Sequence, residues 1–129
     1  MSCRRCAPSQ LCPPCAALLA RAEGTPVAQV TEAQLLARVR EVARRLGMLF
    51  YHTKDSRGSD PGWVDVAMMY PADHPLTGVL WLLELKRTGE VPTLKQRQWL
   101  EALGTVTRVE SGIVWPEDLE ELVQRLMRC

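Results

Sequence analysis

The stretch VLWLLELK, residues 79–86, decides how this chain folds. Six of its eight residues are apolar, and the two charged ones, Glu84 and Lys86, stand near its end. Because successive side chains of a strand point to opposite faces, Glu84 and Lys86 lie on the same face. Burying a carboxylate and an ammonium is costly unless they have partners or a function. The stretch therefore predicts a central strand with a functional site at its end.

A second strand that also carries an acid, Asp65, is predicted upstream, over residues 63–70. An acid on one strand, followed by acid-x-Lys on the next, is the layout of a metal site that cuts phosphodiesters, since Mg²⁺ prefers carboxylate and phosphate oxygens. The pattern predicts that Asp65 and Glu84 bind such a metal ion. The alternatives are an Asp65 that faces solvent and a cross-strand ion pair between Glu84 and Lys86.

The remaining elements follow from caps and apolar spacing. They are expected as a helix over residues 31–46, a strand over 48–53, a helix over 93–103, one or two short strands at 105–109 and 113–115, and a last helix from 116. Thr31 and Gln34 are predicted to form a capping box, and Gly47 is predicted to be the C-cap of the first helix. This order of helix, three strands, helix, strand and helix predicts an α/β domain with a mixed central sheet flanked by helices.

Composition and charge are those of one folded domain. The chain has 129 residues, of which 47% are hydrophobic and 24% charged. It has neither the about 20 apolar residues that span a bilayer nor a signal-peptide pattern, so we expect a cytoplasmic protein with no membrane partner. The net charge of +1 hides a gradient, with seven Arg against three Glu in residues 1–45. A nucleic-acid surface is therefore expected near the first helix and the central loop.

The first 30 residues form a separate Cys-rich extension, and the main domain is expected over residues 31–129. The extension holds two CxxC motifs, Cys3 with Cys6 and Cys12 with Cys15. Such pairs are typical of zinc knuckles, in which thiolates hold Zn²⁺ tetrahedrally, and free or redox-sensitive thiols are the alternative. Disulfides are not expected in a reducing cytosol. The extension thus predicts a structural zinc site.

Four short motifs of the main domain carry a family resemblance. They are YHTKDSR at residues 51–57, PGWVD at residues 61–65, ELK at residues 84–86, and Gln96 with Trp99 three residues later. In combination they resemble the VRR-NUC family of the PD-(D/E)XK nuclease superfamily, in particular its small stand-alone phage and bacterial members. The resemblance covers about residues 31–126. The family usually has Pro before the first Asp, where this chain has Val64; that Pro is a backbone feature and not a ligand.

The resemblance implies a restriction-endonuclease-like core of order α-β-β-β-α-β-α that hydrolyses DNA with Mg²⁺ or Mn²⁺. Asp65 and Glu84 would be metal ligands, with the Leu85 carbonyl as a third. Lys86 would hold or help to deprotonate the attacking water and offset charge on the phosphate. The resemblance also implies cutting of branched DNA, Holliday junctions included, by a homodimer, since two symmetric nicks need two sites related by a twofold axis.

Two helical residues join the candidate site. Glu32 lies within the apolar arc of the first helix, and the resemblance implies that it completes the acidic metal site. The alternative is a first-turn acid favoured by the helix dipole. Gln96 shares a helical stripe with Trp99, and the resemblance implies that it orients water or phosphate. The alternative is the capping-box partner of Thr93, and the two roles are compatible.

The loop after the first strand is expected to contact DNA phosphates, which position a protein without reading sequence. The residues expected to do so are His52, Lys54, Ser56 and Arg57. The alternative is a solvated basic loop. Trp81, Trp99 and Trp115 are expected in the core. For the whole chain, the rival functions are a catalytically inactive zinc-containing module that binds nucleic acid or protein, and a nuclease that acts on flaps, ends or RNA.

Overall fold

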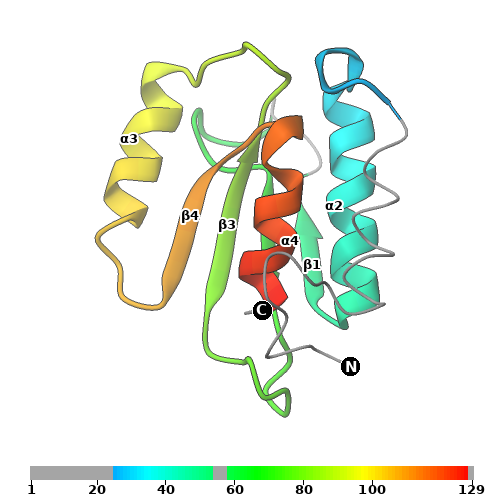
Figure 1. Cartoon of the computed structure of the whole chain (residues 1–129). Helices are drawn as coiled ribbons and strands as arrows, with labels where there is room; N and C mark the ends of the chain where they lie inside the picture. The colour runs from blue at the N-terminus through cyan, green and yellow to red at the C-terminus, as the bar shows by residue number, and fades with distance from the viewer. Residues whose placement is uncertain (1–24, 54–57, 128–129) are drawn as a thin grey trace.

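The structure, a computed structural model, describes residues 25–53 and 58–127 (Figure 1). Several predicted functional residues lie outside these ranges. They are the zinc-site residues Cys3, Cys6, Cys12 and Cys15 and the loop residues Lys54, Ser56 and Arg57. The predictions made for them therefore stay predictions.

The described elements follow the predicted order of helix, three strands, helix, strand and helix. They are η1 (Val27–Gln29), α2 (Glu32–Leu46), β1 (Leu49–His52), β2 (Val66–Met69), β3 (Leu80–Leu85), α3 (Leu94–Leu103), β4 (Val109–Val114), η2 (Pro116–Asp118) and α4 (Leu119–Met127). The predicted strand at residues 105–109 is wrong except for its last residue, because the N–H groups of Thr105 and Val106 donate to carbonyls in the last turn of α3. No described helix has the length and apolar character that crossing a membrane requires.

The four strands form one mixed sheet in the order β1-β2-β3-β4 (Figure 1). β1, β2 and β3 are antiparallel neighbours, whereas β4 runs parallel to β3 after the crossover through α3. β3 is paired on both sides and buried along most of its length, as its apolar run predicts. The predicted α/β fold with a mixed sheet and flanking helices is confirmed.

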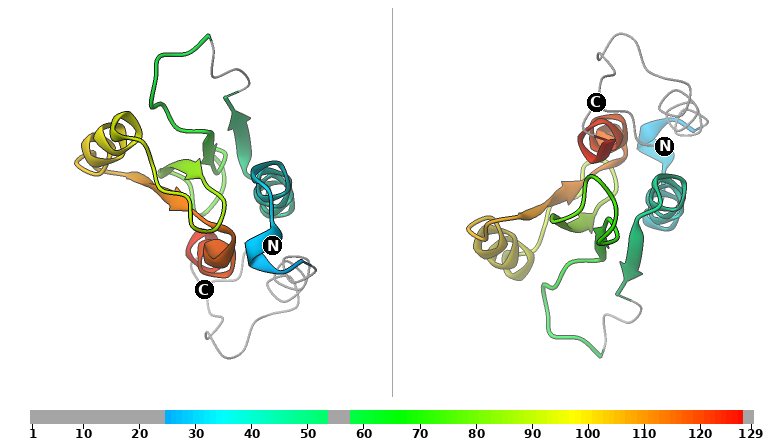
Figure 2. Two further views of the ribbon diagram at one scale, coloured as in Figure 1. Left: turned by 90° about the horizontal axis from the view of Figure 1, so that it is seen from above. Right: turned by 90° about the horizontal axis from the view of Figure 1, so that it is seen from below.

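α2 and α4 cover one face of the sheet, and α3 covers the other (Figure 2). The main core lies on the side of α2 and α4, where Trp81, Leu83 and Leu85 of β3 belong to the buried cluster. α3 differs from the other helices, because none of its residues is fully buried. Trp99 on α3 is exposed, so its predicted place in the core is wrong, whereas Trp81 is buried as predicted.

Capping boxes fix the residues at which α2 and α3 begin. Thr31 Oγ1 accepts from the N–H of Gln34 at 3.1 Å, and Gln34 Oε1 accepts from the N–H of Thr31 at 2.9 Å. Gly47 ends α2 in the left-handed region at φ 73°. Thr93 and Gln96 form the same kind of box at the start of α3. Both boxes satisfy backbone donors that a helix leaves unpaired at its start, and the predicted caps are confirmed.

The loop before β2 is held against α3 at Gly62. This residue has φ 93°, and an added Cβ would stand 2.7 Å from the carbonyl carbon and oxygen of Lys95. Only glycine tolerates this conformation and this approach. Trp63 continues the contact, with its ring centroid 5.0 Å from that of Trp99 in an edge-to-face arrangement. α3 is thereby fixed over the start of β2.

Replacing Gly62 with Ala is expected to lower the free energy of unfolding by about 1–3 kcal/mol, because the new Cβ meets the Lys95 backbone at a φ that L residues avoid. Gly112→Ala is the matched control. Gly112 has no such φ, and no heavy atom lies within 4 Å of an added Cβ, so its effect should stay within about 0.5 kcal/mol. Urea unfolding measures both, and equal stability of the two variants would contradict the close approach.

Candidate active site

Asp65 and Glu84 meet where the start of β2 adjoins the end of β3. The regular antiparallel register of the two strands ends at the pair Val66 and Leu83; Asp65 comes directly before Val66, and Glu84 directly after Leu83. The N–H of Asp65 donates to the carbonyl of Leu83 at 3.1 Å, one residue out of that register. Asp65 Oδ2 in turn accepts from the N–H of Leu85 at 2.8 Å.

Glu84 is a buried carboxylate, with 3% of its surface exposed. Its Oε1 accepts from Gln96 Nε2 at 3.0 Å, but its Oε2 is buried with no hydrogen-bond partner among the described residues. Burial above all, followed by a hydrogen bond with Asp65 and the charge of Asp65, raises the pKa of Glu84 to about 8. That hydrogen bond exists only while one of the two carboxyl groups carries a proton. Once both are ionised, Oε2 lacks a partner.

The two neighbouring carboxyl groups are suited to a divalent cation. Mg²⁺ commonly takes one or two protein carboxylates and completes its shell with water and phosphate. Asp65 and Glu84 supply such a pair, and the cation would give Oε2 the partner that it lacks. Among residues 25–53 and 58–127, no group of three or more His, Cys, Asp or Glu side chains is arranged to hold a metal ion. The described residues thus offer a two-carboxylate site, for which the Leu85 carbonyl stays a predicted third ligand.

Lys86 places a buried cation at the same strand end, with 9% of its surface exposed. Its N–H donates to the Val114 carbonyl at 3.1 Å, which fixes its backbone beside β4. Its ammonium makes no hydrogen bond or ion pair with a described residue, so the alternative of a Glu84–Lys86 ion pair is not realised. Its charge nonetheless acts against the upward pKa shift of Glu84. An anion bound at this strand end would pair with the ammonium of Lys86.

Gln96 forms the predicted capping box with Thr93. Its side chain also contacts the site, through Glu84. Its Oε1 accepts from the N–H of Thr93 at 2.9 Å, while its Nε2 donates to Glu84 Oε1 at 3.0 Å. One amide therefore joins the first turn of α3 to the end of β3. The bond to Oε1 orients Glu84 and leaves Oε2 as the oxygen available for coordination. The predicted role of Gln96 toward water or phosphate stays a prediction.

Glu32, the first residue of α2, lies at the margin of the site and is exposed. Its pKa is raised, first by partial burial and then by the charges of Glu90 and Asp65, while nearby lysine and arginine charges act in the opposite direction. Glu32 therefore lies within electrostatic range of Asp65. Within the described ranges it does not complete a three-carboxylate group with Asp65 and Glu84. Its role in the metal shell stays a prediction.

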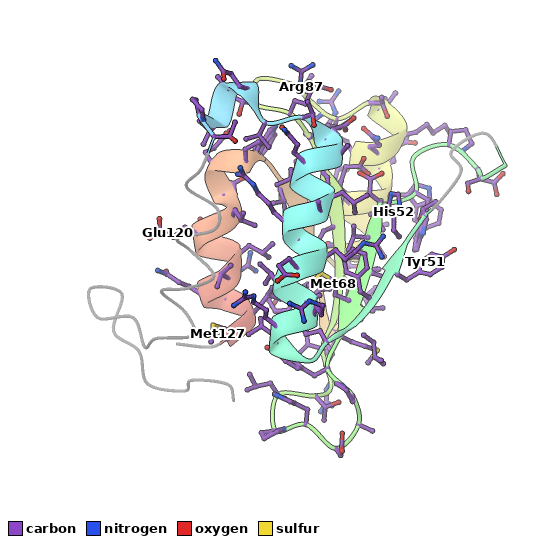
Figure 3. All side chains as sticks on the ribbon, turned by 90° about the vertical axis from the view of Figure 1, so that its right-hand side faces the viewer. Tyr51, His52, Met68, Arg87, Glu120 and Met127 are labelled. Atoms are coloured by element: carbon purple, nitrogen blue, oxygen red, sulfur yellow. The ribbon has the colours of Figure 1, made fainter. Side chains whose placement is uncertain are left out.

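Tyr51 and His52 point to opposite faces of β1. His52 pairs with Val66, whose side chain belongs to the core on the side of α2. Tyr51 pairs with Ala67 and projects away from α2, on the face that carries Asp65 (Figure 3). Tyr51 is exposed, whereas His52 is half-buried. The predicted phosphate contact of His52 stays a prediction.

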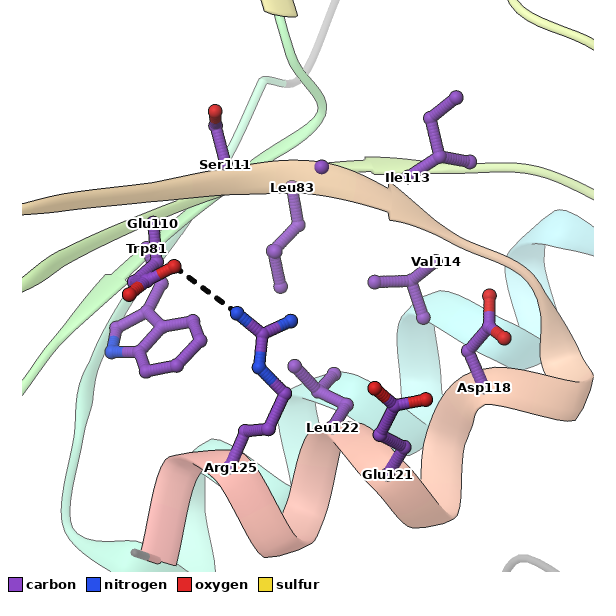
Figure 4. A pocket seen from close by; sticks show the side chains of 11 residues that line it. Trp81, Leu83, Glu110, Ser111, Ile113, Val114, Asp118, Glu121, Leu122 and Arg125 are labelled. Carbon is purple, nitrogen blue, oxygen red and sulfur yellow. Dashed lines mark hydrogen bonds and ion pairs between the residues drawn. The ribbon is translucent and has the colours of Figure 1, made fainter. Parts of the chain in front are cut away.

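A hollow of about 200 Å³ lies elsewhere, between β4 and α4 (Figure 4). Gly112 leaves it open, since no side chain fills this part of the space between strand and helix. Arg125 crosses it, with Nη2 3.1 Å from Glu110 and the guanidinium 5.4 Å from the centre of the Trp81 ring. Because Trp81 is a core residue, the hollow lies on the opposite face of the sheet from Glu84.

The metal-free chain is expected to lose stability as the pH rises from about 4.5 to about 8. The folded state keeps a proton on Glu84 that the unfolded state releases, so this stability is fully present below pH 4.5 and is lost as the pH passes about 8. Unfolding in EDTA across this range measures the decline, which Glu84→Gln should reduce because an amide does not titrate. Glu120→Gln, at an exposed position of α4, is the control and should decline like the wild type. Superimposable wild-type and Glu84→Gln profiles would contradict the shared proton.

Comparison of the chain with protein-family models, with curated proteins and with solved structures finds no significant match. The function must therefore be inferred from the geometry of the site itself. That geometry is a pair of carboxylates on adjoining strand ends, a buried lysine on the same strand end and a glutamine from the neighbouring helix.

Proposed function

We propose that the chain is a metal-dependent nuclease that hydrolyses DNA phosphodiester bonds with Mg²⁺ or Mn²⁺. One observation carries the proposal. Glu84 Oε2 is buried without a described hydrogen-bond partner, next to the carboxyl group of Asp65 and two residues before Lys86, whose side chain is largely buried. A cation held by the two acids would satisfy the orphaned oxygen, and a phosphate drawn to that cation would meet the lysine. A neutral ligand would do neither.

Each residue of the site has a role in this reaction. Bound at the two acids, a divalent cation supplies a Lewis acid and an activated water. Asp65 and Glu84 hold it through carboxylate oxygens, and Gln96 keeps Glu84 oriented through Oε1. Lys86 brings positive charge to the scissile phosphate, where it stabilises the negative charge that accumulates in the transition state.

The topology supports the same proposal. The order of α2, β1, β2, β3, α3, β4 and α4 agrees with the core that the VRR-NUC resemblance implies, and so does the mixed sheet. We therefore propose that the domain is a PD-(D/E)XK nuclease of the VRR-NUC kind. Val64, in place of the usual Pro, is buried, and its carbonyl accepts from Thr53 Oγ1 at 3.0 Å. This hydrogen bond holds the backbone before Asp65 without a proline.

Branched DNA, Holliday junctions included, is the proposed substrate, and a homodimer is the proposed active form. Both proposals rest on the family resemblance and on symmetry, because paired nicks across a junction need two sites related by a twofold axis. A structural Zn²⁺ in the Cys-rich extension and a cytoplasmic setting belong to the same proposal. Flaps, free ends and RNA are alternative substrates for the same chemistry.

The rival from another class is a catalytically inactive module that binds nucleic acid or protein. Such a module has no need of buried charges at its strand ends, and buried charges are costly. Asp65, Glu84 and Lys86 are all present and lie at the same end of the inner strands β2 and β3. Their presence favours the nuclease.

Asp65→Asn is expected to reduce cleavage of a four-way DNA junction in Mg²⁺ by at least about 100-fold, because it removes one of the two metal-binding carboxylates. Wild-type cleavage should stop in EDTA. Asp73→Asn is the control, since Asp73 is exposed in the connection from β2 to β3, at the other end of these strands. Cleavage rates on labelled junctions measure both variants, with circular dichroism to verify folding. Equal rates for wild type and Asp65→Asn would overturn the proposal.

Glu32→Gln is expected to slow cleavage more than Glu41→Gln does. Glu32 lies within electrostatic range of Asp65, whereas Glu41 is hydrogen-bonded to arginines at 2.8–2.9 Å within α2. Single-turnover rates at saturating Mg²⁺ compare the two variants. Similar small effects would leave Glu32 with only the role of an acid at a helix N-terminus.

A further inference from the structure

Two exposed tryptophans lie next to the candidate site. Trp63 and Trp99 have 38% and 40% of their surface exposed. Their ring centroids are 5.0 Å apart and their planes meet at 83°, so the edge of one ring contacts the face of the other. This geometry leaves broad ring surface open to solvent. Tryptophan is on average a highly buried residue, so a clustered, exposed pair is informative.

Each tryptophan is close in the sequence to a residue of the site, Trp63 to Asp65 and Trp99 to Gln96. Trp63 precedes Asp65 by two residues, in the loop that leads into β2. Trp99 follows Gln96 by three residues, which is the next turn on the same side of α3. Gln96 in turn donates to Glu84 at 3.0 Å. The two rings are therefore joined to the carboxylates through α3 and through the loop before β2.

An open groove runs beside Trp99. It has a volume of about 460 Å³ and is lined by Asp60, Pro61, Lys95, Gln98, Trp99 and Ala102. This volume falls within the range of small-ligand sites. Lys95 offers a cation to a phosphate and Trp99 offers a flat ring to a base, while Asp60 is the one acid of the lining. The groove thus combines the two contacts that a single nucleotide uses.

Packing accounts for only part of this arrangement. The ring pair fastens α3 to the loop before β2, together with the close approach of Gly62 to Lys95. A contact made for packing alone gains stability in proportion to the apolar surface that it removes from water. Here more than a third of each tryptophan stays in solvent although both are held in place. A pre-positioned, exposed aromatic surface is what base stacking requires.

We propose that Trp63 and Trp99 form a stacking platform for an unpaired base of the DNA strand that enters the site, with Lys95 on an adjacent phosphate. A base inside a duplex is already stacked on both faces, whereas an unpaired base is free to stack on an aromatic ring. The platform selects branch points, gaps and single-stranded ends over intact duplex. The inference rests on the proposed nuclease function for the identity of the ligand, and it adds the feature of DNA that the site recognises.

The test is DNA binding without metal, in which cleavage plays no part. The Asp65→Asn chain in EDTA is titrated with a labelled oligothymidylate of about 12 nucleotides and with a blunt duplex of equal length, and the single strand is expected to bind more tightly. Adding Trp99→Leu or Trp63→Leu should weaken that binding about 5- to 100-fold, since leucine keeps an apolar contact but has no stacking face. Leu94→Ala, at another exposed apolar position of α3, is the control and should leave binding unchanged.

A second arm leaves both tryptophans in place. An abasic site is moved through the oligonucleotide, and at one position it should weaken binding as much as Trp99→Leu does. Unchanged binding by Trp99→Leu, or by every abasic strand, would overturn the platform. If circular dichroism finds Trp99→Leu unfolded, the abasic series decides. Cleavage in Mg²⁺ is scored separately, so a tryptophan-dependent binder that does not cut overturns the nuclease alone, and a nuclease indifferent to both tryptophans overturns the platform alone.

Discussion

The pairing register between β2 and β3 is the constraint on which the site depends. With Val66 opposite Leu83 as the last pair, Asp65 and Glu84 come together directly beyond the end of the β2–β3 ladder. Because strand side chains alternate between faces, a slip of one residue would carry Asp65 to the core face. The core itself prevents this slip, since Val66 and Leu83 both belong to the buried cluster under α2 and α4. The hydrophobic face thus sets the position of charged groups that it does not contact.

The cost of ionising both Asp65 and Glu84 determines which groups can surround them. Two carboxyl groups this close, one of them buried, ionise together only at high cost, so they share a proton or bind a cation. Gln96 and Lys86, the groups next to the two acids, leave Glu84 Oε2 available for either a proton or a cation. Gln96 satisfies one oxygen of Glu84, and Lys86 contributes charge without closing an ion pair among the described residues. The site therefore keeps one buried oxygen, Glu84 Oε2, without a hydrogen-bond partner among the described residues, and this oxygen is available to a cation.

Features that depend on a few neighbouring residues could be predicted from the sequence, and features that depend on distant packing could not. The capping boxes of Thr31 and Thr93 are local, and both are present as predicted. Burial of Trp99 was wrongly predicted, because the sheet leaves α3 without a fully buried residue. The start of β4 was misplaced because the end of α3 takes the N–H groups of the residues that precede it. The position of Glu32 relative to Asp65 depends on how α2 crosses the end of the sheet, which no spacing encodes.

The double use of Gln96 has a consequence for how this protein can change over generations. Its carbonyl oxygen completes the start of α3, and its amide nitrogen holds Glu84. Glutamate in its place would keep the cap but set a third negative charge against Glu84, and most other residues would lose both contacts. Selection for a well-formed helix and selection for a well-oriented carboxylate therefore act on the same side chain. Neither property can be improved there without risk to the other, so we expect adaptation of this fold to proceed through the exposed rim around the site and through the opposite face of the sheet.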